Sequence, residues 1–467
     1  MPSKKPILTY EFGTLYIKGQ NHYEGDVALE ETTFNHLWNF ILSNKATNDV
    51  DAVMSVHTRG GRRYIKIGRY VGTIQTKDGQ TIEILPKIYD STGEQNLNEV
   101  ICRKIFLNML KHFTDAKAKS FQQASLDTKK GFPILEIFIS NYISKVEQLV
   151  VGGLKKGYSQ ISDNCCFLKG RLDIGKHITR NVANQAKFAI TYNKYVENIP
   201  HNRIIATTLR RLMDISNSPS NRSRITTLLG YMDNIPLSAN IENDLQKSLC
   251  GNRLFSSYEI LIRWSSQFLL NKGFTTFSGS HINQSLLFQA DKLFEDFVAF
   301  LFKKYVPTYT INTQHNKYYL VDKHNERGLF RLRPDIVIEG REGDDNYNCV
   351  IIDTKWKSLN SYRPDKNYLI DIKDMYQLYA YGQKYRLGQI KNQGKDIIPK
   401  LVLIYPYSEN FTERLPDFIY EDIKDNIGLK LMVVPFDLTN ASTYESQVHN
   451  IIRCLDVDID TLPTYKC

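Results

Sequence analysis

The chain has 467 residues, 42% hydrophobic and 24% charged, and its 60 Lys and Arg exceed its 50 Asp and Glu to give a net charge of +10. This composition excludes collagen-like repeats, wholesale disorder and a small disulfide-stapled scaffold, and the length predicts about two to four folded units. No run approaches the roughly 18 apolar residues of a spanning helix, and the N-terminus lacks the pattern of a secretory signal. We therefore expect a cytoplasmic protein that makes no membrane contact.

The positive charge is concentrated in one segment. Residues 154–224 contain 13 Lys and Arg against four Asp and Glu. Clustered cations favour a polyanion such as DNA, because binding releases the counterions of the phosphate backbone, although a solvated helical surface produces the same pattern. The candidate DNA- or partner-binding residues in this segment are Lys155, Lys156, Lys169 and Arg171.

The first 95 residues have the pattern of short strands separated by turns. The segments Val71–Gln75 and Thr81–Leu85 flank the turn at 77–80 and predict a hairpin, which Pro86 closes because proline cannot donate to a strand ladder. One helix is expected near residues 33–42. We interpret residues 1–95 as a β-rich N-terminal domain that docks a partner.

The pattern then changes to a period near 3.6 residues, which is typical of amphipathic helices. Apolar residues fall on one stripe in residues 100–110, 134–146 and 204–212, and a further helix is expected within 254–270. We interpret residues 96–287 as a basic, mainly helical middle region. No repeat of 20–50 residues is present, which argues against a solenoid.

Residues 288–467 alternate between helical and strand patterns. A long amphipathic helix is expected at 292–305, strands at 330–338 and 349–353, a helix at 371–385 and a buried strand at 400–405. This order predicts an α/β domain with a mixed central sheet.

Two aspartates and a lysine in this last region are the candidate catalytic residues. Asp335 follows Pro334, and Asp353 and Lys355 come eighteen and twenty positions later, after the apolar run Val350–Ile352. Adjacent strands joined by a short connection can bring both carboxylates together, and Mg²⁺ prefers such oxygen ligands. Lys355 can orient or help deprotonate an attacking water and offset charge on a scissile phosphate.

The surroundings make this pattern more specific than its three residues alone. Glu295 lies on the polar edge of the helix before it, and Gln377 and Tyr381 are spaced i, i+4 on the helix after it. A helix, a hairpin with carboxylates, a helix and a strand occur in that order in the PD-(D/E)XK nuclease core. The predicted fold class is therefore α+β multidomain, with a β-rich N-terminal domain, a central helical region and a C-terminal α/β nuclease core.

Several segments along most of the chain resemble one family within that superfamily. They are Leu332–Ile338, Ile351–Lys357, Asp374–Tyr381 and Leu403–Pro406 in the C-terminal part, and Val71–Gly72, Ile82–Lys87, Gly153–Tyr158 and Phe167–Asp173 upstream. Together they resemble the McrC family, the nuclease subunit of McrBC-type modification-dependent restriction systems.

The resemblance implies a division of labour between two proteins. A separate AAA+ GTPase, the McrB-like subunit, would recognise 5-methylcytosine-type modified double-stranded DNA and translocate. The present chain would dock on that motor, stimulate its GTP hydrolysis and cut. In agreement, the chain contains no GxxxxGK[ST] phosphate loop of its own.

The resemblance also assigns roles to individual residues. Asp335, Asp353 and Lys355 would be catalytic, with Mg²⁺ on the two aspartates. Glu295 would be an additional acidic member, and Gln377 and Tyr381 would support the site or contact DNA.

Two other functions remain open from the sequence. One is a stand-alone RecB/Cas4-like DNA repair nuclease that trims ends without a motor, although nearly 290 residues precede the nuclease motifs. The other is a non-catalytic adaptor that binds and stimulates a ring NTPase.

Overall fold

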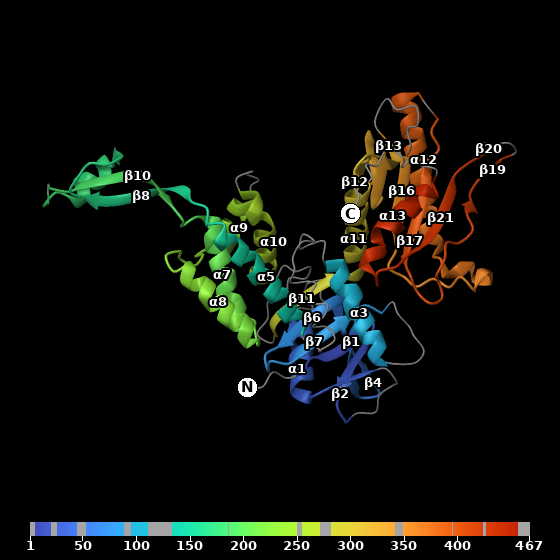
Figure 1. Ribbon diagram of the computed structural model, residues 1–467, viewed down its shortest axis with the longest axis horizontal. Helices are drawn as coiled ribbons and strands as arrows, with labels where there is room; N and C mark the ends of the chain where they lie inside the picture. The colour runs from blue at the N-terminus through green and yellow to red at the C-terminus, as the bar shows by residue number, and fades with distance from the viewer. Residues whose placement is uncertain are drawn as a thin grey trace.

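The computed structural model describes residues 5–19, 26–43, 53–87, 95–110, 133–184, 186–249, 255–270, 282–340, 349–394, 396–423 and 426–455. These residues form an N-terminal unit, a helical unit with a projecting arm, and a C-terminal unit built around a six-stranded sheet (Figure 1). The helical unit and the C-terminal unit extend from the N-terminal unit in diverging directions, so the molecule has a helical limb and a C-terminal limb. Within the described ranges no helix is long and apolar enough to cross a membrane.

The N-terminal unit contains two four-stranded sheets with the orders β1-β7-β6-β11 and β3-β2-β5-β4. Their elements are β1 (Ile7–Tyr10), β2 (Thr14–Ile17), β3 (Val27–Leu29), α1 (Glu31–Ser43), β4 (Met54–Arg59), β5 (Arg62–Ile67), β6 (Tyr70–Thr76), β7 (Thr81–Leu85) and β11 (Ile282–Gln289). The predicted hairpin is confirmed as β6 and β7, and the predicted helix as α1.

The expected limit of this unit at residue 95 is wrong for its first sheet. Strand β11 pairs antiparallel with β6, so the sheet is completed by a strand nearly 200 positions later in the chain. The register places Gly72 opposite Leu287, and Gly72 has a φ of 138°. A Cβ atom there would lie 2.0 Å from the Leu286 carbonyl oxygen, so only glycine permits this close pairing.

The helical unit consists mainly of helices with one apolar stripe each, as expected. Its helices outside the arm are α5 (Ile134–Val151), α7 (Pro200–Ile215), α8 (Pro219–Tyr231), α9 (Ile241–Leu249) and α10 (Ser256–Leu270). α3 (Gln95–Leu110) instead packs on β7 of the N-terminal unit (Figure 1). Pro200 and Pro219 begin their helices, where a missing N–H costs nothing.

Residues 157–196 differ from the mainly helical middle region that the sequence predicted. They form the arm, which extends outward from the helical limb (Figure 1). Its elements are β8 (Gly157–Cys165), β9 (Arg171–Leu172), α6 (Ile174–Arg180) and β10 (Phe188–Val196), with β8 and β10 antiparallel over their whole length. The strands escaped prediction because the arm buries few apolar side chains, so no hydrophobic alternation marks them.

The C-terminal unit has the predicted mixed sheet, with strand order β12-β15-β16-β17-β21-β18. Its elements are α11 (Ala290–Tyr305), β12 (Thr310–Thr313), β13 (Tyr319–His324), β14 (Arg327–Arg331), β15 (Ile336–Glu339), β16 (Cys349–Thr354), α12 (Ile372–Gln393), β17 (Lys400–Pro406), β18 (Phe418–Ile419), β19 (Asp422–Ile423), β20 (Asn426–Ile427), β21 (Lys430–Phe436) and α13 (Tyr444–Arg453), with short 3₁₀ turns at Pro364–Leu369 and Ala441–Thr443. β16, β17 and β21 are parallel, whereas β12, β15 and β18 pair antiparallel with their neighbours.

Both faces of this sheet are buried, which explains its nearly continuous apolar strands. Ile336, Ile338 and Ile352 pack with α11 and α13, whereas Val337 and Ile351 pack with α12 on the other face. Alternate side chains of one strand point to opposite faces, so each strand contributes to two hydrophobic layers.

The single strand expected at 330–338 is instead two strands in different sheets. β14 ends at Arg331 and pairs only with β13, whereas β15 begins at Ile336 in the main sheet. Phe330 has a φ of 56°, and Pro334 has no N–H to donate. These two residues break the ladder immediately before Asp335.

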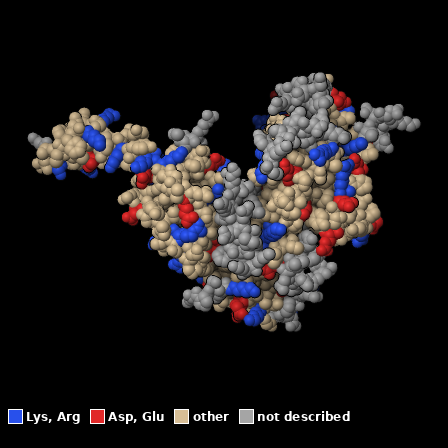
Figure 2. Space-filling view, viewed as in Figure 1, with Lys and Arg blue, Asp and Glu red and all other residues tan. Residues whose placement is uncertain are grey.

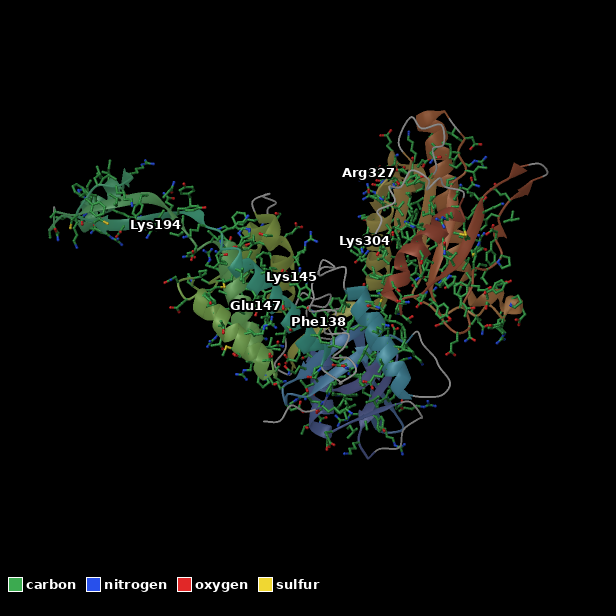
Figure 3. The ribbon with its side chains drawn as sticks, viewed as in Figure 1. Phe138, Lys145, Glu147, Lys194, Lys304 and Arg327 are labelled. Atoms are coloured by element: carbon green, nitrogen blue, oxygen red, sulfur yellow. The ribbon has the colours of Figure 1, made fainter. Side chains whose placement is uncertain are left out.

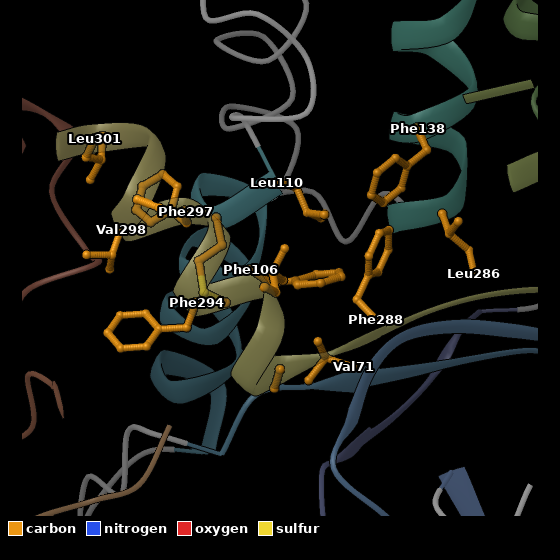
Figure 4. Packing of buried hydrophobic residues seen from close by; sticks show 14 of the residues in the cluster. Val71, Phe106, Leu110, Phe138, Leu286, Phe288, Phe294, Phe297, Val298 and Leu301 are labelled. Atoms are coloured by element: carbon orange, nitrogen blue, oxygen red, sulfur yellow. The ribbon is translucent and has the colours of Figure 1, made fainter. Parts of the chain in front are cut away.

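One hydrophobic cluster runs continuously through the three units (Figure 4). Phe288 of β11 stacks on Phe138 of α5, and its edge meets Phe106 of α3, each with a ring-centroid distance of 6.0 Å. Phe294 and Phe297 of α11 belong to the same cluster. The sheet of the N-terminal unit and the sheet of the C-terminal unit therefore share a core.

The close pairing of β6 and β11 gives a stability prediction. Gly72→Ala should destabilise the protein by about 3 kcal/mol or more, because it adds a steric clash to an unfavourable φ. Gly79 has a φ of 78°, and a Cβ atom added there would meet no other atom within 4 Å. It is the matched control, and Gly79→Ala should cost only about 1 kcal/mol. Thermal and urea unfolding measure the loss of stability in each variant. Equal losses of stability in the two variants would contradict this account.

Candidate active site

The pairing of β15 with β16 brings Asp335 and Asp353 together. Ile336 lies opposite Ile352 in this ladder, so the residues that follow the same register, Asp335 and Asp353, meet at one end of it. Asp335 Oδ2 accepts hydrogen bonds from the Thr354 backbone N–H at 2.7 Å and from the Thr354 hydroxyl at 2.8 Å. The predicted juxtaposition of the two carboxylates is therefore present.

Lys355 and two residues of α12 complete one side of the site. Lys355 Nζ forms an ion pair with Asp353 Oδ2 and donates to Gln377 Oε1 at 3.0 Å. Gln377 Nε2 in turn donates to the Tyr381 hydroxyl at 2.7 Å. The i, i+4 pair that the sequence indicated thus forms a chain of hydrogen bonds that ends on the lysine.

Glu295 lies at the opposite side of the two aspartates, on α11. Its Oε1 accepts from Lys292 Nζ at 2.7 Å and from Gln314 Nε2. The Gln314 backbone N–H donates to the Asp335 carbonyl oxygen at 3.0 Å, which ties this side chain to the strand that carries the site. The structure therefore places Glu295 beside the candidate site, and its negative charge acts on both aspartates.

Asp374 is a site residue that the sequence reasoning did not select. It lies in the first turn of α12, is 6% exposed, and precedes Gln377 by one helical turn. Its carboxylate accepts from Lys357 Nζ at 3.1 Å and from the Tyr405 hydroxyl at 3.3 Å, and it lies 3.8 Å from Lys355 Nζ. Its i, i+3 spacing to Gln377 was the available signal.

The buried carboxylates destabilise each other's charged forms. Burial, followed by the charges of Asp353 and Glu295, raises the pKa of Asp335 to about 8, against the opposing effect of the Thr354 hydrogen bonds. Burial also raises the pKa of Asp353, although the Lys355 ammonium opposes this. Burial would lower the pKa of Lys355, but the Asp353 carboxylate outweighs it and raises that pKa above its usual value. The site therefore favours bound cations.

The donors available for a divalent metal are few. In the described part of the chain no group of three or more His, Cys, Asp or Glu is arranged to hold a metal ion. Asp335 and Asp353 provide two buried carboxylates whose mutual repulsion a cation would relieve. Mg²⁺ is commonly held by one or two carboxylates, with water and substrate phosphates completing its shell, so the donor set fits this ion.

The four basic candidates of the middle segment do not join this site. Lys155 and Lys156 lie at the base of the arm, where the Lys155 N–H donates to the Tyr258 hydroxyl at 2.9 Å and Lys156 pairs with Glu197 at 3.3 Å. Lys169 and Arg171 lie on the arm itself, which carries more Lys and Arg than Asp and Glu on the visible face (Figure 2). Any role of these residues is separate from the aspartate centre.

The chain belongs to the family of McrBC 5-methylcytosine restriction system components, because the model of that family matches residues 65–406. The chain is thus a component of an McrBC-type restriction system. A comparison with curated proteins found no match.

The chain was also compared with solved structures. The chain is similar to a chain of the refined half-complex from a tetradecameric assembly of Thermococcus gammatolerans McrB AAA+ hexamers with bound McrC, with a TM-score of 0.62 and 18% identity over 96% of this chain and 100% of that one. A match to the cryo-EM structure of the Thermococcus gammatolerans McrBC complex has a TM-score of 0.45 and 19% identity over 64% of this chain and 88% of that one. At 18% identity the first of these likenesses shows the fold alone.

The raised pKa of Asp335 predicts a pH-dependent stability in the absence of divalent metal. A carboxyl whose folded pKa is raised stabilises the fold at low pH and loses that contribution as the pH rises from about 4 towards about 8. Asp335→Asn keeps an oxygen that can accept from Thr354 but carries no charge. It should therefore be more stable than the wild type in EDTA at pH 8, by at most about 5 kcal/mol, since the pKa rises from 3.8 to about 8 and each pKa unit corresponds to about 1.4 kcal/mol.

The measurement is thermal unfolding of both proteins from pH 5 to pH 8.5 in EDTA. The difference in melting temperature should grow with pH. A difference that stays constant, or a variant less stable at every pH, would contradict the assigned cause.

Proposed function

We propose that this chain is the DNA endonuclease subunit of a modification-dependent restriction system, with a PD-(D/E)XK core that hydrolyses phosphodiesters in the presence of Mg²⁺. The observation that carries the proposal is the convergence of Asp335, Asp353 and Lys355 at the paired ends of β15 and β16. The family membership supports the restriction system, and the geometry supports the nuclease role.

The two aspartates would hold the metal ion. Bound there, Mg²⁺ would supply Lewis-acid polarisation of the phosphate and a more acidic water. Asp335 is already oriented by two hydrogen bonds from Thr354, so its carboxylate needs little rearrangement. Glu295 adds negative charge next to this pair and fits the role of an additional acidic member of the site.

Lys355 supplies the positive charge of the protein at this site. Its raised pKa keeps the side chain an ammonium near neutral pH, so it can donate hydrogen bonds to water and offset charge on a scissile phosphate. Gln377 donates to the Tyr381 hydroxyl and accepts a hydrogen bond from Lys355 Nζ at 3.0 Å. This hydrogen bond orients the lysine side chain. Asp374 Oδ1 lies 3.8 Å from its Nζ and adds a second negative charge beside the ammonium.

The hairpin of β13 and β14 is suited to contact the substrate backbone. It leads directly into Asp335, and residues 317–333 contain five Lys and Arg against two Asp and Glu. One of those acids, Asp322, is already paired with Lys384 and Lys391. Arg327 and Lys304 lie on the side of the C-terminal limb that faces the helical limb (Figure 3). This excess positive charge favours phosphate contacts.

The partner in this proposal is a separate AAA+ GTPase of the McrB type. The support is the similar fold in an assembly described as McrB AAA+ hexamers with bound McrC, together with the absence of a GxxxxGK[ST] loop in this chain. The repair-nuclease and adaptor alternatives differ from this proposal in whether cleavage needs the partner and whether cleavage occurs at all.

The decisive test is substitution of one metal-binding aspartate. Asp353→Ala should lower cleavage of methylated plasmid with Mg²⁺, partner and GTP by more than about 100-fold, because it removes a metal ligand worth several kcal/mol. Stimulation of the partner's GTP hydrolysis should remain. Asp365→Ala, at an exposed position of the same unit, is the matched control and should cut normally.

The alternatives give different results in this experiment. Cleavage by the chain without partner or GTP would support the repair nuclease. GTPase stimulation by a wild type that never cuts would support the adaptor, and normal cutting by Asp353→Ala would refute the nuclease site.

The hairpin gives a separate binding prediction. Lys323→Ala with Arg327→Ala should weaken duplex DNA binding measured in Ca²⁺ and reduce the slope of log affinity against log salt by about 2, one for each lost phosphate contact. Arg453→Ala, which removes an exposed charge from α13, should leave the slope unchanged. An unchanged slope in the hairpin variant would show that this surface does not contact DNA.

A further inference from the structure

Glu11 of the N-terminal unit is buried against the segment that carries the candidate lysine. It follows β1 at a tight turn in which Phe12 has a φ of 61°, and it is only 2% exposed. Its backbone N–H donates to the Leu85 carbonyl oxygen at 2.9 Å. The turn therefore directs this carboxylate away from solvent.

One oxygen of Glu11 joins two units of the molecule. Oε1 accepts from the Lys87 backbone N–H at 2.8 Å, just after β7, and from Trp356 Nε1 at 3.0 Å. Trp356 is 345 positions away in the chain and immediately follows Lys355. The end of the N-terminal hairpin and the end of β16 thus share a single acceptor atom.

Trp356 is also held from its other side. Its ring lies 5.3 Å from that of Phe294, measured between centroids, and Phe294 is the residue before Glu295. The neighbouring Lys355 N–H donates to the Ile404 carbonyl oxygen at 2.9 Å. The Trp356 indole therefore contacts Phe294, which precedes Glu295 in the chain, and donates to Glu11.

This arrangement is unfavourable for stability. The second oxygen of Glu11, Oε2, has no hydrogen-bond partner among the described residues, and burial raises the pKa of the side chain. A buried carboxyl with an unmatched oxygen costs about 1–3 kcal/mol, and an indole N–H needs only one acceptor, which a neutral group could provide. Packing alone does not account for a glutamate here.

We propose that Glu11 is a positioning residue for the nuclease centre: by fixing the Trp356 indole it fixes the backbone at Lys355, so the N-terminal unit forms part of the working active site. The inference rests on the proposed nuclease function. It also assigns a role to the segment that ends in Lys87, which the sequence had marked as a hairpin closed by Pro86 and as one of the segments that resemble the family.

A second link supports the same coupling. The Ala290 N–H, at the start of α11, donates to the Arg69 carbonyl oxygen at 3.1 Å, and the Arg69 side chain pairs with Asp291 at 3.4 Å. The N-terminal unit therefore holds both the helix that carries Glu295 and the segment that carries Lys355. If the N-terminal unit were displaced, both the helix that carries Glu295 and the segment that carries Lys355 would move with it.

The test is a double-mutant cycle in the full-length chain, with partner, GTP, Mg²⁺ and methylated plasmid. Glu11→Ala and Trp356→Phe should each lower the single-turnover cleavage rate about 10-fold, because a small misplacement of a catalytic group is costly. The double variant should be no slower than either single variant. DNA affinity should stay within about twofold, and Glu11→Gln, which keeps an acceptor for the indole, should retain most of the rate.

Matched controls separate positioning from general destabilisation. Glu30→Ala removes an exposed carboxylate of the same unit, and Trp38→Phe changes another half-buried tryptophan, and both should cut at the wild-type rate. Trp356→Phe keeps a ring against Phe294, so it remains informative should Glu11→Ala not fold. Wild-type rates in Trp356→Phe, or effects of the two substitutions that multiply, would overturn the proposal.

Tryptophan fluorescence reports on the surroundings of Trp356 independently of cleavage. The chain has three tryptophans, so Trp38→Phe with Trp264→Phe leaves Trp356 as the only one. In that background Glu11→Ala should shift the emission maximum and Glu11→Gln should not, and an unchanged spectrum in Glu11→Ala would count against the proposal. Failure of the nuclease function itself is recognised separately, from equal cleavage by the wild type and Asp353→Ala.

Discussion

The antiparallel register of β15 and β16 is the constraint on which the candidate site depends. Because Ile336 pairs with Ile352, Asp335 and Asp353 must meet, and a shift of one residue would turn one aspartate towards the opposite face of the sheet. The register is held by hydrophobic side chains on both faces, since α11 and α13 cover one and α12 the other. The break at Phe330 and Pro334 frees Asp335 from the hairpin that precedes it, so the aspartate is positioned by Thr354 instead.

The same burial that positions these carboxylates makes them costly. Asp335 and Asp353 meet where burial disfavours charge, with Glu295 nearby, and the Lys355 ammonium opposes only part of the resulting rise in the pKa of Asp353. A protein optimised for stability alone would not retain this pair, whereas the proposed binding of a cation and a phosphate would account for it. Gln377, Tyr381 and Asp374, all on α12, then determine where the lysine can point, which is why the first half of this helix matters to the proposed chemistry.

The N-terminal unit is connected to this centre more closely than a separate docking domain would be. Strand β11 completes its sheet and continues directly into α11, and Phe288 joins the cores of α3 and α5. Glu11 then reaches Trp356 across the boundary. A ligand or partner that moved this unit would act on both α11 and β16, because the shared core transmits displacement through packed side chains. The arm, by contrast, projects from the helical limb and buries little of its own surface.

The sequence by itself determined the local features. The period of 3.6 identified most of the helices, and apolar strand segments next to Asp335 and Asp353 indicated a paired carboxylate site, because periodicity and burial leave a local record in the sequence. Gln377 and Tyr381 could be selected because i, i+4 spacing is also local. Only the tertiary structure decided that β11 belongs to the first sheet, that residues 157–196 form an arm of strands, and that Glu11 contacts Trp356, next to Lys355. These features depend on contacts between residues far apart in the chain or on surfaces without an apolar pattern, and neither leaves a periodic signal in the sequence.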